Sequence, residues 1–339
     1  MAFVPESRST AVHAVWRATG TGLMALKRPI ATRTLLVGVT GGTGFVGREL
    51  ITRLVRAGHG VRLATRNAAH ADALLPLSSV ELAVGNVYDR EFLRRSLEGC
   101  DVAINLVGIL NEPGHNGAGF RRAHVEFTAG LLRAMQAAHV PRLLQMSALN
   151  ADAEHGRSYY LRSKGQAEQL VRGAGALEWT IFRPSVIFGP EDSLSRRFAN
   201  LLRLTRGLLP LARASARFAP IYVGDVAKAF MLALEGDATV AQTYELCGPE
   251  VLTLAQIVRL SAEAAQLPCR VLPLPDALAR IQAALMGLLP GKPFSSDNYR
   301  SLLSDSVCRD NGCERLGLQP ASFRAWAPLW LHPLPRPAQ

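Results

Sequence analysis

The sequence predicts an α/β fold in which helices cover both faces of a doubly wound parallel sheet. Short apolar runs of strand length alternate with amphipathic runs of helix length from Thr34 to Arg183. A glycine cluster connects the first strand to the first helix, and small or polar residues follow several later strands. Because strands separated by helices cannot pair as hairpins, we expect them to run parallel between two helical layers.

A glycine motif connects the first expected strand, 34–39, to the first expected helix, 45–57. Gly41 permits the turn, Gly44 lets the backbone approach a pyrophosphate, and Gly47 lets the helix pack closely on the strand. The helix N-terminus adds free N–H groups and a positive dipole end, which attract anions. The motif therefore predicts a bound dinucleotide, held by Gly41, Gly44, Phe45, Val46 and Gly47.

The residues after the second expected strand, 61–65, concern the choice of dinucleotide. This strand ends about 20 residues after the glycine motif, where NAD-binding folds place an acidic residue on the ribose 2′-OH. The chain has Thr65, Arg66 and Asn67 here, without a carboxylate. Since Arg66 can bind a 2′-phosphate, we expect NADP(H) to be favoured over NAD(H). The alternative is that Arg66 is an ordinary surface arginine.

The later strands also end in residues that suit a ligand, because ligands of such sheets lie at the carboxyl ends of the strands. From these ends we expect nucleotide contacts from Asn86, Val87, Val107, Gly108 and Pro184, with a simple turn asparagine as the alternative for Asn86. The strands concerned are 80–84, 102–107, 142–146 and 179–183, and the helices between them are 68–75, 89–97, 116–138 and 158–173.

A second group of residues predicts proton transfer. Tyr160 and Lys164 are four residues apart at a helix start, so their side chains share one face. The ammonium group can lower the pKa of the phenol and reach a nicotinamide ribose, while the hydroxyl of Ser147 can hold a substrate carbonyl. We therefore expect Ser147, Tyr160 and Lys164 to be catalytic, with Tyr160 and Lys164 also touching the nucleotide.

The β-α alternation loosens after Pro184. Residues 186–224 are rich in Arg, Leu and Pro, and Asp225 stands where it would be the N-cap of a helix, 226–234. A strand near 243–246, a helix at 253–265 and a Leu/Pro-rich tail follow. We expect three parts: an N-terminal extension, 1–33, that is disordered; a Rossmann-type NAD(P)-binding domain, 34–185; and a smaller substrate-side α/β domain, 186–339, partly interleaved with the second part.

The N-terminal extension has two interpretations. Residues 1–32 carry four basic side chains against Glu6 alone, which is typical of a mitochondrial targeting segment. The interpretation that we favour is that residues 1–23 precede the true start at Met24. The expected location is then the cytoplasm, with a peripheral position on the inner membrane, and the alternative is the mitochondrial matrix.

Composition restricts the class of protein. A hydrophobic content of 48% with 19% charged residues is typical of globular chains, and no apolar run approaches the ~18 to 20 residues of a membrane-spanning helix. The net charge of +11 attracts phosphate, but the arginines lack the aromatic interleaving of nucleic-acid modules, so no specific nucleic-acid partner is expected. A denser cluster forms either a solvated face or a dock for an anionic bilayer: Arg196, Arg197, Arg203, Arg206, Arg213 and Arg217.

The cysteines are odd in number and widely spread, which suits a reducing compartment. They are Cys100, Cys247, Cys269, Cys308 and Cys313. Because no second cysteine pair or histidine set accompanies Cys308 and Cys313, we expect no metal site.

Together these motifs resemble the extended and atypical branches of the short-chain dehydrogenase/reductase superfamily. The resemblance rests on residues 40–47, Tyr160 with Lys164, residues 183–192 and residues 222–227. More narrowly, residues 147–151 with 160–164 and the Phe-Gly-Pro-Glu-Asp run at 188–192 are similar to the nucleotide-binding accessory subunit of mitochondrial respiratory complex I and its bacterial relatives.

The resemblance implies two functions. The first is an accessory or assembly protein that holds NADPH and associates with respiratory-chain subunits or quinone metabolism at the membrane. The amphipathic stretch 278–286 would then lie on a bilayer, whereas its alternative is an ordinary packed helix. The second is an NADP-dependent oxidoreductase or epimerase/dehydratase that acts on a hydrophobic carbonyl or alcohol. A redox-sensing regulator of transcription is a third hypothesis.

The sequence departs from the superfamily pattern at two positions. Only thirteen positions separate Ser147 from Tyr160, which is short for extended members, and Asn86 stands where many relatives carry aspartate. The first departure concerns the geometry of the serine, and the second concerns the contact with adenine.

Overall fold

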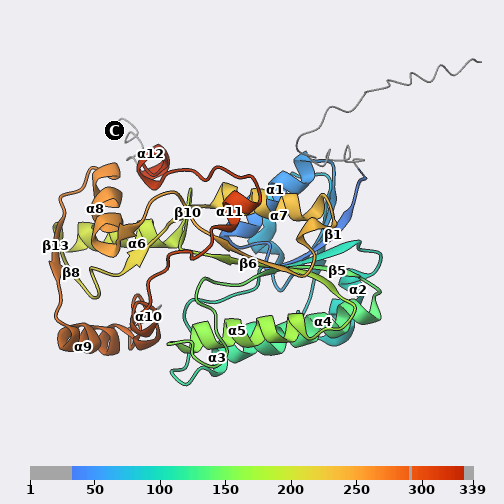
Figure 1. Ribbon diagram of the computed structural model, residues 1–339, viewed down its shortest axis with the longest axis horizontal. Coiled ribbons are helices and arrows are strands. Elements are labelled where there is room, and N and C mark those ends of the chain that lie inside the picture. Colours follow the sequence, from blue (N-terminus) through green and yellow to red (C-terminus); the bar gives the residue numbers. More distant parts are fainter. Residues whose placement is uncertain (1–32, 290–291, 332–339) are drawn as a thin grey trace, which may run out of the picture. The chain divides into compact units, whose positions relative to one another are not determined.

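The central sheet is parallel throughout (Figure 1). The structure, a computed structural model, describes residues 33–289 and 292–331. Within these ranges seven strands pair in the order β11-β6-β5-β4-β1-β2-β3, which confirms the predicted doubly wound α/β fold. The strands are β1 (Leu36–Thr40), β2 (Gly60–Thr65), β3 (Val80–Val84), β4 (Val102–Asn105), β5 (Arg142–Met146), β6 (Glu178–Pro184) and β11 (Gln242–Leu246).

Helices cover the two faces of this sheet (Figure 1). On one face α1 (Phe45–Arg56) packs against α7 (Val223–Leu234), and on the other α4 (Phe127–Ala137) packs between α2 (Arg90–Leu97) and α5 (Tyr159–Arg172). Each helix turns an apolar stripe toward the strands, as Leu50, Ile51 and Leu54 of α1 do with no exposed surface. Strand order reverses between β1 and β4, so the ligand edge is expected at their carboxyl ends.

Two expected helices have a different form. Residues Ala68–Leu74 are a 3₁₀ helix, η1, in which Ala71 and Leu74 are the buried positions, and this spacing of three suits the tighter helix. The expected helix 116–138 contains α3 (Ala118–Phe120), a π-helical stretch η2 (Arg121–Glu126) and α4. Such π stretches are frequent at functional sites.

The prediction that Asp225 is an N-cap is wrong. Helix α7 begins at Val223, because the short strand β10 (Ile221–Tyr222) ends there with Tyr222 in an extended conformation. Asp225 lies in the first turn instead, where its carboxylate accepts hydrogen bonds from Lys228 and from the backbone N–H of Ala321. The expected strand 102–107 is also shorter, since β4 ends at Asn105.

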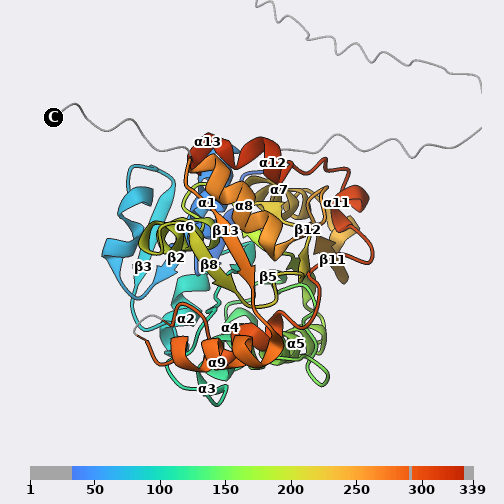
Figure 2. The same cartoon turned by 90° about the vertical axis from the view of Figure 1, so that its left-hand side faces the viewer.

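The C-terminal half adds the edge strand β11 to the sheet and builds a region beside it (Figures 1 and 2). Short strands pair there as β7 with β10, β8 with β13 and β9 with β12. The division of the chain at residue 185 stays a prediction, and the expected extension 1–33 lies outside the described residues except for Arg33. The elements are β7 (Ile187–Phe188), α6 (Ser193–Leu204), β8 (Leu208–Leu211), β9 (Arg217–Phe218), η3 (Asp237–Thr239), β12 (Leu252–Thr253), α8 (Leu254–Ala264), β13 (Arg270–Pro273), α9 (Asp276–Met286), α10 (Ser296–Ser301), α11 (Gly312–Arg315), α12 (Phe323–Trp326) and α13 (Pro328–Leu331).

Two of the cysteines form a disulfide, whereas their number and spacing suggested free thiols in a reducing compartment. Cys247, next to β11, forms a disulfide with Cys308, and their Cα atoms are 6.0 Å apart. The bond ties the edge of the sheet to the segment before α11.

Across residues 33–289 and 292–331, no helix has the length and hydropathy needed to cross a membrane.

Candidate functional site

The turn after β1 has the geometry that a glycine motif requires. Gly41 has φ +74°, and a Cβ atom there would lie 2.7 Å from the backbone of Leu106 and Val107 in the loop after β4. A Cβ on Gly47 would collide with the backbone of Gly42. The turn packs tightly between β1, the loop after β4 and α1. For this reason neither Gly41 nor Gly47 can be replaced by a larger residue without a shift of the backbone.

The N-terminus of α1 faces away from this packed side. Gly44 is its N-cap, and no side chain caps the helix. A Cβ on Gly44 would meet only the Gly41 carbonyl oxygen, at 3.2 Å, among the described residues. The first-turn N–H groups, which include those of Phe45 and Val46, have no partners within the helix. This end of α1 therefore fits the diphosphate of a dinucleotide.

The Phe-Gly-Pro-Glu-Asp run lies against the same turn. The Arg48 guanidinium of α1 pairs with the Glu191 carboxylate at 2.5 Å. A Cβ on Gly189 would be 3.2 Å from the Phe45 ring, and Asp192 caps α6. The run thus connects the glycine turn to the first helix of the C-terminal half.

The strand ends beyond β2 and β3 carry the residues expected at the adenosine. Arg66 is exposed just after β2, and no side-chain partner for it is found in the described part of the chain. Asn86 is exposed after β3, where its Oδ1 accepts from the N–H of Tyr88 at 3.0 Å and leaves its amide NH₂ group available. Val87 packs in the core of the α2 and α4 face, and Pro184 is buried at the end of β6.

Lys164 lies beside Gly108, which follows β4. The Lys164 ammonium is buried and donates to the carbonyl oxygen of Met146 at 3.3 Å. A Cβ on Gly108 would lie 3.2 Å from Lys164 Nζ. Burial lowers the pKa of Lys164 to about 8, against the opposing attraction of Glu168. A buried ammonium beside a glycine backbone is suited to hold a ribose hydroxyl.

The expected lowering of the Tyr160 pKa is not found. Burial raises the pKa of the half-buried Tyr160 phenol to about 12. The Lys164 ammonium donates to the Met146 carbonyl oxygen, so it does not offset the effect of burial on the pKa of the Tyr160 phenol. The phenol is therefore protonated at neutral pH, and it is a hydrogen-bond donor to whatever lies beside it.

His124 is a neighbour of this pair that the sequence did not reveal. Its Nδ1 lies 2.8 Å from Ser163 Oγ, its Nε2 accepts from the N–H of Ile109 at 3.2 Å, and its ring centroid is 5.6 Å from that of Tyr160. Burial, and secondarily the Lys164 charge, lowers the pKa of His124 to about 2. The hydrogen bonds assign its proton to Nδ1. The only sequence signal at His124 is the apolar periodicity around it. That periodicity predicts burial, but it does not distinguish a residue of a functional site from a residue of the core.

Ser147 does not join Tyr160. Its hydroxyl donates to the fully buried carboxylate of Glu168 at 2.6 Å. Arg183 binds both oxygens of the same carboxylate at 2.7 and 2.6 Å, and Arg172 adds an ion pair at 2.8 Å. The structure therefore brings Tyr160 and Lys164 together and engages Ser147 elsewhere.

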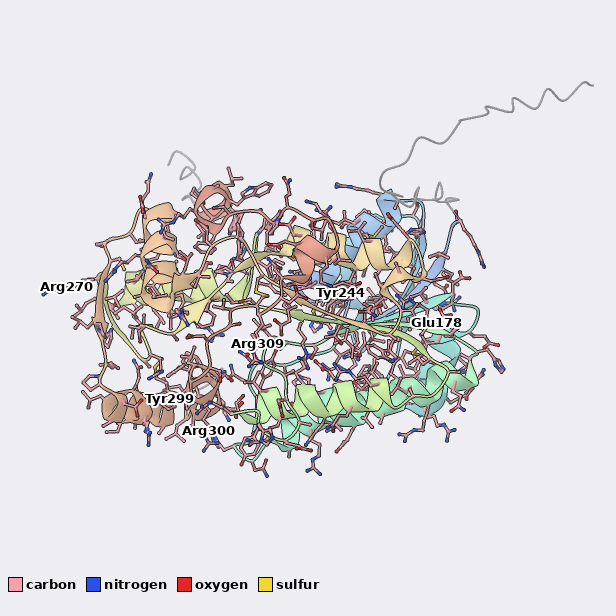
Figure 3. The ribbon with its side chains drawn as sticks, in the orientation of Figure 1. Glu178, Tyr244, Arg270, Tyr299, Arg300 and Arg309 are labelled. Atoms are coloured by element: carbon pink, nitrogen blue, oxygen red, sulfur yellow. A yellow bond between two sulfur atoms is a disulfide. The ribbon has the colours of Figure 1, made fainter. Side chains whose placement is uncertain are left out.

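Helix α10 holds the start of the helix that carries Tyr160. The Asp297 carboxylate accepts from the N–H groups of Tyr159 at 2.7 Å and Tyr160 at 3.1 Å. Figure 3 shows Tyr299 and Arg300 of α10 beside the N-terminal end of α5. More than 130 residues separate Asp297 from these partners, so no sequence motif could have pointed to it.

Tyr160 also lines a cavity of about 410 Å³. Helices α6, α8, α9 and α10 and strand β8 supply most of its lining, which is chiefly aliphatic and aromatic. The site thus has two compartments: a polar edge on the sheet that suits a dinucleotide, and an apolar cavity on the other side of Tyr160.

Comparisons with known proteins agree with this geometry. A model of NAD(P)H-binding proteins matches residues 41–199, and one of the 3-beta hydroxysteroid dehydrogenase/isomerase family matches residues 152–249. NADH dehydrogenase (ubiquinone) 1 alpha subcomplex subunit 9, mitochondrial, of Mus musculus is 30% identical over 293 residues, which are 83% of this chain and 76% of the mouse protein. The (4-alkanoyl-5-oxo-2,5-dihydrofuran-3-yl)methyl phosphate reductase of Streptomyces griseus is 30% identical over 217 residues, 63% of this chain and 68% of the reductase.

A solved structure shares the fold. UDP-glucose 4-epimerase of Thermotoga maritima superposes with a TM-score of 0.69 at 17% identity, over 88% of this chain and 97% of the epimerase. The glycine turn, the parallel sheet and the family matches together establish a dinucleotide-binding domain. The chain belongs to the NAD(P)H-binding, atypical short-chain dehydrogenase/reductase family that includes subunit 9 of the mitochondrial NADH dehydrogenase alpha subcomplex.

Proposed function

We propose that this protein binds NADPH in preference to NADH. The diphosphate would lie at the N-terminus of α1, the 2′-phosphate on Arg66, and the nicotinamide ribose on Lys164 and Tyr160. The observation that carries the preference is Arg66, an exposed guanidinium after β2 with no partner among residues 33–289 and 292–331. Arginine is suited to phosphate because its planar fork makes paired hydrogen bonds.

The nucleotide would be held as a structural or sensing group rather than turned over. Support comes from the engagement of Ser147 with Glu168. A carbonyl substrate would lack the serine donor expected of the superfamily. The role would then be that of an accessory or assembly protein for respiratory-chain subunits. In support, the mouse relative is named as a subunit of a mitochondrial NADH dehydrogenase (ubiquinone) subcomplex.

A membrane surface is the proposed place of action. The surface-facing side of α9 and its C-terminal turn carries a set of large apolar side chains, here called the α9 face, that are 51% to 75% exposed. Their spacing forms one stripe on an amphipathic helix, which suits the interface of a bilayer. The opposite side of α9 packs through Ala279 and Ala283. The residues of the α9 face are Leu278, Ile281, Leu285, Leu288 and Leu289.

The predicted arginine cluster supports this location in part. Arg196 and Arg203 are exposed on α6, where they are free to meet anionic headgroups. Arg217 pairs with Asp305 at 2.8 Å, and Arg197 turns to the cavity. The protein would thus be peripheral on the inner membrane, on the cytoplasmic side or, for a mitochondrial form, on the matrix side.

The second candidate is a reductase of a hydrophobic carbonyl compound. It is favoured by the position of Tyr160 between the nucleotide edge and the apolar cavity. NADPH would supply hydride, while the Tyr160 phenol would donate its proton to the carbonyl oxygen and Lys164 would hold the ribose. The proton donor is in place, but the second donor to the carbonyl is not Ser147.

One experiment separates the two candidates. Protein purified without added nucleotide is analysed for bound NADPH and then incubated with hydrophobic quinones, aldehydes and ketones. Retained NADPH that stays reduced supports the accessory role. Oxidation of NADPH that Tyr160→Phe abolishes, with the nucleotide still bound, contradicts it and establishes the reductase.

A further inference from the structure

The cavity beside Tyr160 has the size of a ligand site. Its volume of about 410 Å³ lies within the range of about 300 to 1,000 Å³ found for small-molecule sites. Phe198, Leu201 and Leu254 are typical of its lining. A cavity of this size with this lining suits a small apolar ligand.

Most polar side chains of the lining are already hydrogen-bonded within the protein. Asn298 donates to the Leu110 carbonyl oxygen at 3.1 Å, and Gln282 donates to that of Pro210 at 3.0 Å. The Tyr160 hydroxyl, by contrast, has no partner in the described part of the chain. Further lining side chains that donate to protein oxygens are Asn111, Thr205 and Ser301.

Arg197 brings a positive charge to this apolar wall. It lies half-buried on α6, and its Nη1 donates to the Pro293 carbonyl oxygen at 2.7 Å. No acidic side chain forms an ion pair with Arg197 within residues 33–289 and 292–331. A partly desolvated cation without an anion is unfavourable, so an anionic group of a ligand would complement it.

Helix α9 separates the cavity from the α9 face. Gln282 and Met286 line the cavity, while Leu278, Ile281 and Leu285 of the same helix are exposed on the other side. If the α9 face rests on a bilayer, as proposed above, the cavity lies one helix away from the lipid. A ligand that partitions into membranes would then reach it.

We propose that this cavity binds a single-chain anionic lipid, with the hydrocarbon chain along the leucine and phenylalanine lining and the carboxylate on Arg197. The charge of Arg197 selects an acid over a neutral chain such as an isoprenoid quinone. A single chain is proposed because the volume lies in the lower part of that size range. The assignment is independent of the nucleotide, which would occupy the polar side of Tyr160.

The test uses displacement of cis-parinaric acid, a fluorescent fatty acid, from the full-length protein by tetradecanoate and by tetradecanol. These two competitors differ only in the head group. The wild type is expected to bind the acid about tenfold more tightly than the alcohol, because a charge-assisted pair replaces a neutral contact. Arg197→Gln is expected to remove this difference and leave the affinity for tetradecanol unchanged.

Two variants make the test specific. Arg259→Gln changes an exposed arginine of α8, a helix that also borders the cavity, but Arg259 does not line it, so the change should leave both affinities unchanged. Leu201→Trp fills the cavity and should abolish both. NADPH titration and thermal unfolding of each variant show whether the nucleotide site and the fold survive, so loss of lipid binding is distinguishable from loss of the proposed nucleotide function.

Three results would overturn the proposal. The first is absence of saturable parinaric acid binding to folded protein. The second is equal affinity of the wild type for tetradecanoate and tetradecanol, which would mean that the cavity does not discriminate between an anionic and a neutral head group. The third is an equal effect of Arg197→Gln and Arg259→Gln, which would mean that general surface charge attracts the acid.

Discussion

Arg66 determines which pyridine nucleotide the site prefers in this account. Arg66→Glu is expected to weaken NADPH binding about tenfold to a hundredfold, because a charged hydrogen bond to the 2′-phosphate is replaced by repulsion. NADH, which lacks that phosphate, should bind the variant about as well as it binds the wild type. Calorimetric titration measures both affinities. Arg133→Glu on α4, another exposed arginine, is the control, and an equal ratio of affinities in Arg66→Glu and wild type would contradict the assignment.

His124 should make the fold sensitive to acid. Its pKa is about 6.5 in the unfolded chain and about 2 in the folded protein, so below pH 6.5 the unfolded state binds the proton and the folded state does not. Stability from this group is therefore lost as the pH falls from about 6.5 toward 2. Between pH 7 and pH 5 the loss amounts to about 2 kcal/mol.

Urea unfolding at these two pH values tests this expectation. His124→Gln retains a polar side chain but cannot gain the proton, so its free energy of unfolding should fall less than that of the wild type over the interval. A decrease of the same size in both proteins would show that His124 does not carry the acid sensitivity.

The glycine turn and α1 act as one element, and two of its glycines should differ in what they support. Gly44 has an extended backbone, and a Cβ there would meet only the Gly41 carbonyl oxygen, at 3.2 Å, within the described residues. A small shift of the turn relieves this contact, so Gly44→Ala should keep its fold and bind NADPH more weakly. Gly47→Ala places a Cβ against the backbone of Gly42 and should lower the free energy of unfolding by about 1 to 3 kcal/mol. Thermal unfolding and NADPH titration of the pair separate the two effects. Loss of fold in Gly44→Ala with a stable Gly47→Ala would reverse the assignment.

Helix α9 is the element proposed to meet the membrane. Ile281→Asp with Leu285→Asp should reduce flotation with anionic vesicles several-fold, because two large apolar side chains would no longer enter the interface. Leu75→Asp, which changes a similarly exposed leucine just after η1, should leave flotation unchanged. Vesicle binding that survives the double change on α9, or that Leu75→Asp reduces equally, would rule out the α9 face as the docking surface.

The parts that could be predicted from sequence are those encoded locally. The strand, glycine turn and helix are contiguous, and Tyr160 and Lys164 are one helical turn apart, so periodicity and spacing were sufficient. The form of η1, the π stretch at His124 and the start of α7 depend on what each segment packs against. For that reason the helix expected at 68–75 takes the 3₁₀ form, and the expected N-cap at Asp225 was wrong.

The parts that could not be predicted depend on contacts between distant segments of the whole molecule. The sequence predicted that Ser147 acts together with Tyr160, but in the structure the Ser147 hydroxyl donates a hydrogen bond to the Glu168 carboxylate. Asp297 caps α5 from far along the chain, and Cys247 pairs with Cys308 across 61 positions. No local pattern encodes such contacts, because tertiary packing alone brings the residues together.

The central claim is that NADPH binds at the carboxyl edge of the sheet, with its diphosphate at the first turn of α1. Calorimetric titration of the folded, nucleotide-free protein with NADPH and with NADH tests it most directly. The account predicts saturable binding of NADPH at one site per chain, with NADH weaker. An absence of heat with both nucleotides, confirmed by unchanged thermal unfolding in their presence, would contradict it.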